Sequence, residues 1–311
     1  MFDHPEQATN MGAPANTRRA TASAAIPAFV NAGGGSAKAA IEALERNPGF
    51  DIRLTPPEQC VVALRRAVSG GAPRVVVAGG DGTIASAASV LAGTSTALAV
   101  LPGGTLNHFA RDHGIPTDLD EALRVAEHGG VRPVDVGYVN DQLFLGTSSV
   151  GAYVRFVQTR DRLERYLGYW LASLAAGLRI LRTLRSIKVT LESGGEVRVY
   201  SSPLAFVAVG ERELTPPGLG RLTAAPGGAL HVVVPRGRRQ ARRFVRAYAR
   251  LDRGLEVEPR ALGLDSALVD RLRLDLPMRV VKVAMDGEIR RQRTPLEYRL
   301  DRGALNLVVP S

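Results

Sequence analysis

The sequence predicts two domains, an α/β domain followed by an antiparallel β-sandwich domain, and three observations lead to this fold class. In residues 25–140, short apolar runs alternate with amphipathic helical patterns, as in a parallel sheet that is covered by helices on both faces. In residues 141–311, most segments are short and alternate between apolar and polar residues, as in antiparallel sheets with one buried face. A chain of 311 residues, 45% of them hydrophobic, is also long enough for two cores.

The first domain follows a polar, Ala-rich segment, residues 1–24, which we expect to be a disordered leader. The alternating pattern predicts strands over residues 26–31, 50–54, 74–79 and 96–101, and helices over residues 37–46, 56–69, 83–92 and 104–112. Glycine clusters follow three of these strands directly. Ligands of parallel α/β sheets bind beyond the carboxyl ends of the strands, so these glycine turns mark the expected binding edge.

The second domain combines short strands with one long helix. The stretch VRPVDVGYVNDQLFLGTSSVG, residues 131–151, predicts two strands joined by a polar turn. A helical pattern over residues 151–184 places an apolar stripe on one face, formed by Leu167, Leu171, Leu174, Leu178 and Leu181. We expect this stripe to pack in a core or between the domains, and a lipid-binding groove is the alternative. Further strands are predicted over residues 186–192, 196–200, 203–209, 229–235, 269–275, 278–285 and 304–309, with a helix inserted near 239–253 and a last strand that can return to the first domain.

Composition and charge restrict the class of protein. The net charge of +10 and the pI of about 10.4 favour an anionic partner such as a phosphate-rich ligand, a nucleic acid or an anionic membrane surface. We expect no nucleic acid, because few aromatic residues accompany the arginines. No apolar run reaches the length of a membrane span and the N-terminus lacks a signal-peptide core, so we expect a cytoplasmic protein. The single cysteine, Cys60, excludes an intrachain disulfide and a cysteine-cluster metal site, and we expect it to be buried.

The turn GGDGT, residues 79–83, has the chemistry of a phosphate site. It ends a predicted strand and begins a helix, whose first N–H groups carry partial positive charge. Its glycines let a phosphate approach the backbone closely. Asp81 would repel a bare phosphate, so its presence indicates a bridging Mg²⁺ or a hydroxyl contact. The alternative is that Asp81 or Thr83 caps an ordinary strand-to-helix turn.

Two further glycine turns are expected at the same edge of the sheet. The stretch LPGGTLN, residues 101–107, carries Thr105 and Asn107 directly after a strand. The stretch NAGGGSAK, residues 31–38, begins with Asn31 and contains three glycines. Three such turns at one sheet edge favour a nucleotide site over structural coincidence.

A fourth motif lies near the end of the chain, where MDGE, residues 285–288, ends in Glu288. An alcohol acceptor in phosphoryl transfer needs a carboxylate that orients it and accepts its proton. The alternative is that Asp286 and Gly287 form only a hairpin turn, with Glu288 in solvent. In this order, the four motifs resemble the diacylglycerol kinase catalytic family, which includes sphingosine and ceramide kinase relatives, and the resemblance covers roughly residues 25–310.

The resemblance implies a fold and a set of site residues. The fold is an α/β nucleotide-binding domain similar to those of phosphofructokinases and NAD kinases, joined to a β-sandwich, with the active site between them. The implied cofactors are ATP and Mg²⁺, with Asp81 near the metal through the ATP phosphates. Asp81 and Glu288 are the implied catalytic residues, and Glu288 is the base. The implied nucleotide-binding residues are Asn31, Gly33, Gly34, Gly35, Ser36, Thr55, Gly79, Gly80, Asp81, Gly82, Thr83, Thr105 and Asn107.

The chain departs from the family pattern at two positions. Many members have Asn-Asp where this chain has Asn107-His108, so a carboxylate that can organise Mg²⁺-bound water is missing. His108 either faces a phosphate or is a surface or capping histidine. Members with a structural metal site in the second domain have an aspartate where this chain has Gly227, so we expect no Mg²⁺ site there.

We therefore expect a lipid kinase that transfers the γ-phosphate of ATP to a hydroxyl of diacylglycerol or a related long-chain lipid, a reaction of phospholipid metabolism. The alternatives are an NAD-kinase-like enzyme, which shares GGDGT, and a catalytically weakened nucleotide- or lipid-binding regulator. The expected partner is a lipid substrate at the inner membrane surface. The basic stretch 236–253, with eight arginines, either lies on an anionic membrane or packs on the sandwich. The sequence is compatible with a homodimer and specifies neither the lipid nor the number of subunits.

Overall fold

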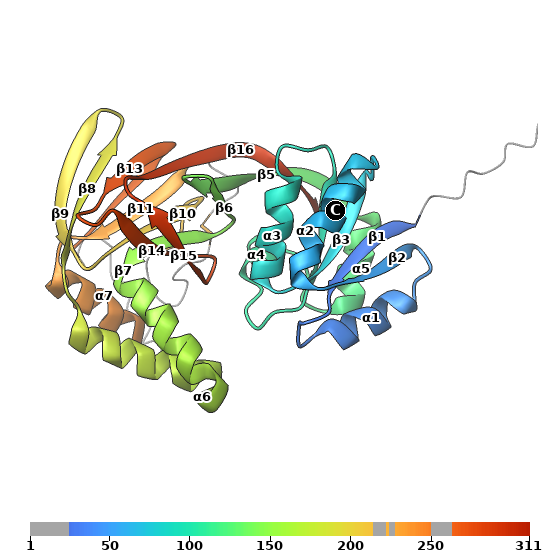
Figure 1. Ribbon diagram of the computed structural model, residues 1–311, viewed down its shortest axis with the longest axis horizontal. Coiled ribbons are helices and arrows are strands. Elements are labelled where there is room, and N and C mark those ends of the chain that lie inside the picture. Colours follow the sequence, from blue (N-terminus) through green and yellow to red (C-terminus); the bar gives the residue numbers. More distant parts are fainter. Residues whose placement is uncertain (1–24, 214–221, 224–227, 250–262) are drawn as a thin grey trace, which may run out of the picture.

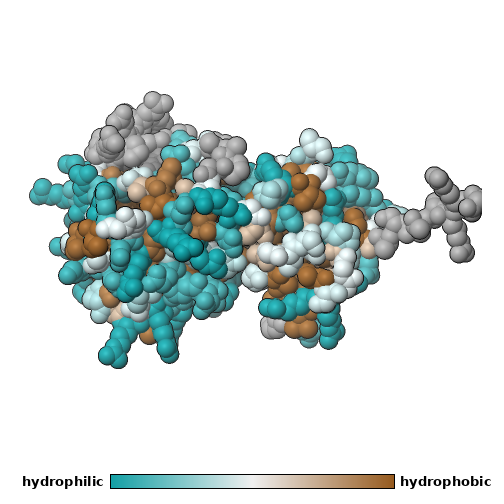
Figure 2. Space-filling model, turned by 90° about the horizontal axis from the view of Figure 1, so that it is seen from above, coloured by the Kyte–Doolittle hydropathy of each residue, from teal (hydrophilic) through white to brown (hydrophobic). Residues whose placement is uncertain are grey.

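The computed structural model describes residues 25–213, 222–223, 228–249 and 263–311, so the leader predicted for residues 1–24 lies outside the described part. Two lobes lie side by side in Figure 1, and the view from above in Figure 2 shows a narrow waist between them. One lobe is an α/β unit and the other is built from antiparallel sheets. The predicted fold class is therefore confirmed.

Four parallel strands form the sheet of the first lobe. Their order is β2 (Phe50–Thr55), β1 (Ile26–Asn31), β3 (Arg74–Gly79) and β4 (Ala97–Pro102). Helices α1 (Ala37–Glu45) and α5 (Leu119–His128) cover one face, and helices α2 (Pro57–Ser69) and α3 (Asp81–Leu91) cover the other. Strands β3 and β4 are almost entirely buried, as expected for a sheet covered on both faces. Cys60 on α2 is buried in this core, as predicted.

Two helices of this lobe differ from the prediction. A helix is predicted over residues 104–112, but α4 spans only His108–Asp112, because Asn107 has a left-handed backbone (φ 50°, ψ 46°). Helix α5 is not predicted at all. Its signal is nonetheless present, because Asp118 accepts the backbone N–H of Glu121 at 2.9 Å, and an Asp followed three residues later by a Glu is a helix-start pattern.

Two antiparallel layers enclose the core of the second lobe. One layer is a six-stranded sheet in the order β12 (Leu264–Val269), β11 (Leu230–Pro235), β10 (Leu204–Val209), β7 (Thr147–Gly151), β14 (Val280–Met285) and β15 (Glu288–Arg293). The facing layer contains β13 (Arg271–Asp275), β8 (Ile187–Ser193), β9 (Glu196–Ser202) and the first part of β16 (Leu296–Val309). The sequence pattern does not predict β12 or β15. Both are edge strands without a regular alternation of apolar and polar residues, since β15 is mostly charged and exposed, and β12 has three consecutive exposed residues, 266–268.

The long strand β16 joins the two lobes into one sheet. It pairs with β13 in the second lobe, runs antiparallel to β5 (Gly130–Val139), and pairs in parallel with β4 of the first lobe at Leu307 and Leu98. Figure 1 shows β16 and β5 spanning the waist. The stretch predicted as two strands over residues 131–151 forms three, because β6 (Gln142–Phe144) lies between β5 and β7.

Helix α6 (Ala152–Thr183) differs from the continuous helix predicted over residues 151–184. It is broken at Gly168, whose backbone (φ 70°, ψ 166°) is not helical, so it forms two segments at an angle (Figure 1). Its leucine stripe is not packed in a core, because Leu167, Leu171, Leu174 and Leu178 are exposed. The prediction of core or interdomain packing is therefore wrong for these four leucines.

The basic stretch forms helix α7 (Arg238–Ala249), which begins against the end of α6. The remainder of the stretch, residues 250–253, lies outside the described residues. Ala241 of α7 is buried against Ile180 and Leu184, so this helix does pack on its neighbours while Arg238, Arg239, Arg242 and Arg243 face solvent. Among the described helices, none has the length together with the apolar composition that a transmembrane span requires.

Candidate active site

The three predicted glycine turns meet at the carboxyl edge of the parallel sheet. They follow β1, β3 and β4, which are neighbours in the sheet. The side chain of Asn31 donates to Thr83 Oγ1 at 3.0 Å, joining the first turn to the second. Ser36 Oγ donates to the Gly103 carbonyl at 2.7 Å, and the Gly103 N–H donates to the Gly79 carbonyl at 2.9 Å. The structure thus brings these segments together into one polar edge.

Glycine is required where these turns approach one another. A Cβ on Gly79 would lie 2.7 Å from the Cβ of Thr83, and a Cβ on Gly104 would lie 2.8 Å from the Cα of Gly80. Real Cβ atoms essentially never make contacts this short. The glycines therefore permit close backbone packing as well as access to the first N–H groups of α3.

Asp81 is the first residue of α3 and its carboxylate faces the start of α4. Its two oxygens accept the backbone N–H groups of His108 and Phe109, both at 3.2 Å. The side chain of His108 is exposed. Asp81 therefore stabilises the N-terminus of a neighbouring helix, where a negative charge is favourable. A carboxylate has about four lone-pair sites, so two donors leave room for further contacts.

The other predicted nucleotide-binding residues surround this turn in different ways. Asn107 accepts the Gly104 N–H at 2.8 Å and donates to the Gly104 carbonyl at 2.9 Å, so it fixes the shape of the third turn. Thr105 is exposed beside it. Gly33 donates its N–H to the side chain of Asn31 at 3.0 Å. Thr55 pairs with Asn31 across the strands, but it is buried and donates its hydroxyl to the Arg53 carbonyl, so its side chain is already engaged.

Glu288 reaches this edge from the second lobe. A Cβ on Gly82 would lie 2.5 Å from Glu288 Oε1, so the carboxylate lies directly against the GGDGT turn. Asp286 (φ 46°) and Gly287 (φ 87°) form the hairpin turn between β14 and β15. Asp286 and Gly287 thus form a hairpin turn, and this turn places Glu288 beside the GGDGT turn. The two alternatives from the sequence are therefore compatible. Its other oxygen, Oε2, pairs with Arg290 at 2.8 Å.

Asp286 also belongs to this site, although its sequence pattern indicates only a turn. Its carboxylate accepts three backbone N–H groups, from Leu145, Gly146 and Thr147, at 2.7 to 2.9 Å. Burial raises the pKa of Asp286, nearby Asp81 raises it further, and the three N–H donors oppose the increase. Asp286 thus fixes the hairpin to the loop before β7. No local pattern reveals this anchor, since its partners lie about 140 residues earlier.

The donor chemistry of the turn fits a Mg²⁺ ion that is held together with nucleotide phosphates. Mg²⁺ in nucleotide sites is usually bound through one or two carboxylates plus phosphate oxygens. Asp81 supplies a carboxylate at the turn. Within the described part of the chain, no group of three or more His, Cys, Asp or Glu side chains forms a complete protein-only metal site. The second-domain position discussed above, Gly227, lies outside the described residues.

A buried ion pair connects α4 to the second lobe beside this site. Arg212 Nη1 donates to the Asp112 carboxylate, while its Nε and Nη2 donate to the Val209 carbonyl at 3.2 and 3.0 Å. His113 follows Asp112, and its pKa is lowered to about 4, mainly by burial and in addition by the positive charges of Arg132 and Arg212. This histidine is therefore neutral in the folded protein at neutral pH.

Comparison of the sequence with known families and proteins agrees with these motifs. Residues 27–139 match the family model of the diacylglycerol kinase catalytic domain. The chain is 38% identical over 108 residues to "Probable lipid kinase YegS-like" of Cronobacter sakazakii, which covers 33% of this chain and 36% of that protein. It is 35% identical over 127 residues to a diacylglycerol kinase of Bacillus subtilis, which covers 40% of this chain and 42% of that protein. The aligned segments thus span less than half the length of these two relatives.

Structural similarity extends over both lobes. A solved diacylglycerol kinase structure from Bacillus anthracis superimposes with a TM-score of 0.68 at 19% sequence identity, covering 92% of this chain and 96% of that chain. At 19% sequence identity, this comparison establishes the fold alone. The family match, in contrast, falls on the lobe that carries the three glycine turns. Residues 27–139 are therefore similar in sequence to the diacylglycerol kinase catalytic domain, and the chain has the two-lobed fold of a solved diacylglycerol kinase.

Proposed function

We propose that this protein is an ATP- and Mg²⁺-dependent lipid kinase. One observation carries the proposal: the hairpin of the second lobe holds the Glu288 carboxylate against Gly82 in the GGDGT turn. A phosphate-binding turn and a carboxylate base on opposite lobes are what a kinase needs to bring a phosphoryl group and an alcohol together. The names of the relatives support a lipid as the alcohol.

The phosphates of ATP bind at the carboxyl edge of the parallel sheet. The first N–H groups of α3 face the phosphates, because Gly79, Gly80 and Gly82 carry no side chains that would block them. Asn31 and Asn107 act indirectly, because their hydrogen bonds hold the first and third turns in shape. Ser36 does the same through the Gly103 carbonyl, and Thr105 contacts the nucleotide from its exposed position. Thr55 supports Asn31 from the neighbouring strand.

Glu288 acts as the base. It accepts the proton of the lipid hydroxyl while the hydroxyl oxygen forms a bond to the γ-phosphorus and the bond between that phosphorus and the β,γ-bridging oxygen breaks. ADP leaves with the bridging oxygen, and the lipid carries the phosphate. Arg290, which pairs with Glu288 Oε2, orients the carboxylate.

Asp81 would hold the Mg²⁺ through its carboxylate. The ion would neutralise the charge of the transferring phosphoryl group. The hydrogen bonds from His108 and Phe109 fix the orientation of the Asp81 carboxylate toward the turn. Because position 108 is a histidine and not an aspartate, Asp81 would be the principal protein ligand of the ion.

The acceptor is a hydroxyl of diacylglycerol or a related long-chain lipid, met at the inner surface of the membrane from the cytoplasmic side, where ATP is present. An NAD-kinase-like activity is not favoured, because the matched family and the named relatives are lipid kinases. Labelled ATP incubated with a panel of hydroxyl-bearing lipids tests the proposal directly. The appearance of labelled lipid supports the proposal. If no lipid becomes labelled, the proposal is contradicted, and a nucleotide- or lipid-binding regulator is the remaining alternative.

The change Glu288→Gln isolates the proposed base. We expect kcat to fall by about 10²- to 10⁴-fold while the Kd for ATP stays nearly unchanged, because the amide cannot accept the proton. Glu196→Gln is the matched control. Glu196 also pairs at 2.8 Å with an arginine two residues later, Arg198, but it lies on β9, far from the turn in the sheet order. Full turnover of the Glu288 variant would remove Glu288 from the mechanism.

A further inference from the structure

The second segment of α6, residues 169–183, turns large apolar side chains toward solvent. Leu171, Leu174 and Leu178 are 60%, 58% and 51% exposed, and their spacing places them on one side of the helix. The opposite side carries Ala172, Ala176 and Ile180, which are buried. Alanines and one isoleucine thus face the protein, and the leucines face outward. An amphipathic helix that packs on a core usually turns its leucines inward.

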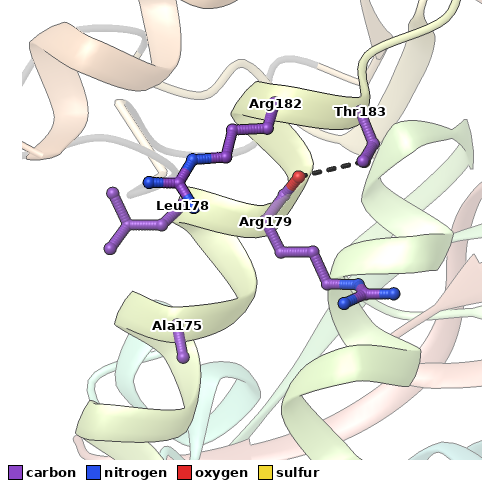
Figure 3. A pocket seen from close by; sticks show the side chains of 5 residues that line it. All are labelled: Ala175, Leu178, Arg179, Arg182 and Thr183. Carbon is purple, nitrogen blue, oxygen red and sulfur yellow. Dashed lines mark hydrogen bonds between the residues drawn. The ribbon is translucent and has the colours of Figure 1, made fainter.

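Positive charge accompanies these leucines. Arg179 and Arg182 are exposed on the same segment, and Figure 3 shows the side chain of Arg182 beside Leu178, with Arg179 extending in another direction. Together with Ala175, Leu178 and Thr183 they line a cavity of about 410 Å³. Arg179 and Arg182 form no ion pair with any described residue, and residues 169–183 contain no acidic side chain.

Helix α7 extends the positive surface. Its first residue, Arg238, donates to the Leu184 carbonyl at 3.4 Å, just after the end of α6. Arg239, Arg242 and Arg243 are exposed beyond it, and the whole of α7 lacks acidic residues. In Figure 1 the two helices lie together at the lower edge of the second lobe. The surface is therefore both apolar and uniformly basic.

We propose that this surface, the α6 face (Leu171, Leu174, Leu178, Arg179 and Arg182), docks the protein on an anionic phospholipid bilayer. The leucines enter the boundary between headgroups and acyl chains, and the arginines of α6 and α7 bind lipid phosphates. A second copy of this chain fits the face less well, because it would bring two basic surfaces together without acidic residues to pair them.

The α6 face is connected to the proposed base. The first segment of α6 packs through Val154 and Val157 against Ala284 and Ile289, which lie on the hairpin that carries Glu288. Docking thus holds this hairpin at a fixed place relative to the bilayer from which the acceptor comes. This consequence rests on the proposed function, whereas docking itself is measurable without turnover.

The test is co-sedimentation of the full chain with vesicles of phosphatidylcholine, with and without phosphatidylglycerol. We expect the triple variant Leu171→Gln, Leu174→Gln, Leu178→Gln to lose about tenfold or more in binding to the anionic vesicles. The matched control is Leu54→Gln, Val199→Gln, Leu268→Gln, whose residues are 58%, 60% and 51% exposed on other surfaces. It should bind like the wild type. Arg179→Gln with Arg182→Gln should weaken binding to anionic vesicles and reduce its salt dependence.

Unchanged vesicle binding of the leucine triple variant would overturn the proposal. So would a wild-type dimer that the triple variant converts to a monomer while vesicle binding persists, because the face would then join two copies. Turnover separates this proposal from the proposed function. With a short-chain, water-dispersed diacylglycerol the triple variant should match the wild type, and with vesicles it should be slower. A wild type that binds vesicles through this face but phosphorylates no lipid supports docking and contradicts only the kinase.

Discussion

The carboxylate of Asp81 caps a helix that begins 27 residues later in the chain. A cap is expected from an aspartate at a strand-to-helix turn, and a metal-binding carboxylate is expected from the same residue. Asp81 does cap a helix, but this helix is α4 and not α3, to which Asp81 itself belongs. Its two oxygens still have free lone pairs with which to bind a metal ion. The observed capping contact and the proposed Mg²⁺ contact can therefore share one side chain.

His113 makes stability depend on pH. Its pKa is about 4 in the folded protein and 6.5 as a free side chain, so between these values the unfolded chain binds a proton that the folded chain does not. Its contribution to stability is therefore full above pH 6.5 and is lost as the pH falls toward 4. Between pH 7.5 and pH 4, we expect the free energy of unfolding of the wild type, measured in urea, to fall by roughly 3 kcal/mol more than that of His113→Gln. Parallel pH profiles of the two proteins would contradict this.

Single residues of the site differ in how far the sequence reveals them. The glycine turns and Glu288 are found from local motifs, because short-range spacing encodes a strand end, a helix start or a hairpin. Asp286 and Arg212 are not found, since their partners lie 140 and 100 residues away. Thr55 is included by resemblance, but its hydroxyl donates within its own strand.

Among the elements, α6 shows where periodicity predicts a helix but not the side that it buries. Leucines at helical spacing predict a core stripe, yet the protein side of the helix is formed by alanines and Ile180. Hydrophobicity alone cannot distinguish a stripe that packs internally from one kept for a partner surface. The edge strands β12 and β15 are missed for another reason, because neither shows the regular alternation of apolar and polar residues that identifies a half-buried strand.

The break at Gly168 requires glycine. Its backbone lies in a region that side chains rarely adopt, so Gly168→Ala should lower the free energy of unfolding by about 1–3 kcal/mol. Gly177 is the matched control in the same helix, with nothing within 4 Å of its Cβ position. Gly177→Ala should instead stabilise by about 0.5–1 kcal/mol. Thermal unfolding measures both changes, and a stabilised Gly168 variant would mean that the break is not needed.

At the scale of the whole molecule, the buried pair of Asp112 and Arg212 connects the two lobes. Asp112→Ala should cost about 3–5 kcal/mol of unfolding free energy, because it removes the carboxylate that pairs with a buried guanidinium. The pair of Arg46 and Asp120 is exposed, so Asp120→Ala should cost at most about 1 kcal/mol. Denaturant unfolding distinguishes them. Equal, small losses would show that the lobes are held together by β16 and β5 alone.

The path of β16 has a consequence for how the protein is made. The first lobe's sheet is completed by Leu305–Val309, although β5, its antiparallel partner, ends at Val139. A ribosome that adds about 5–20 residues per second needs on the order of ten seconds or more between these two strands. During that time the first lobe has an unpaired strand edge. We therefore infer that the three glycine turns are synthesised early, whereas the sheet that carries them is completed only when the last strand of the chain has been made.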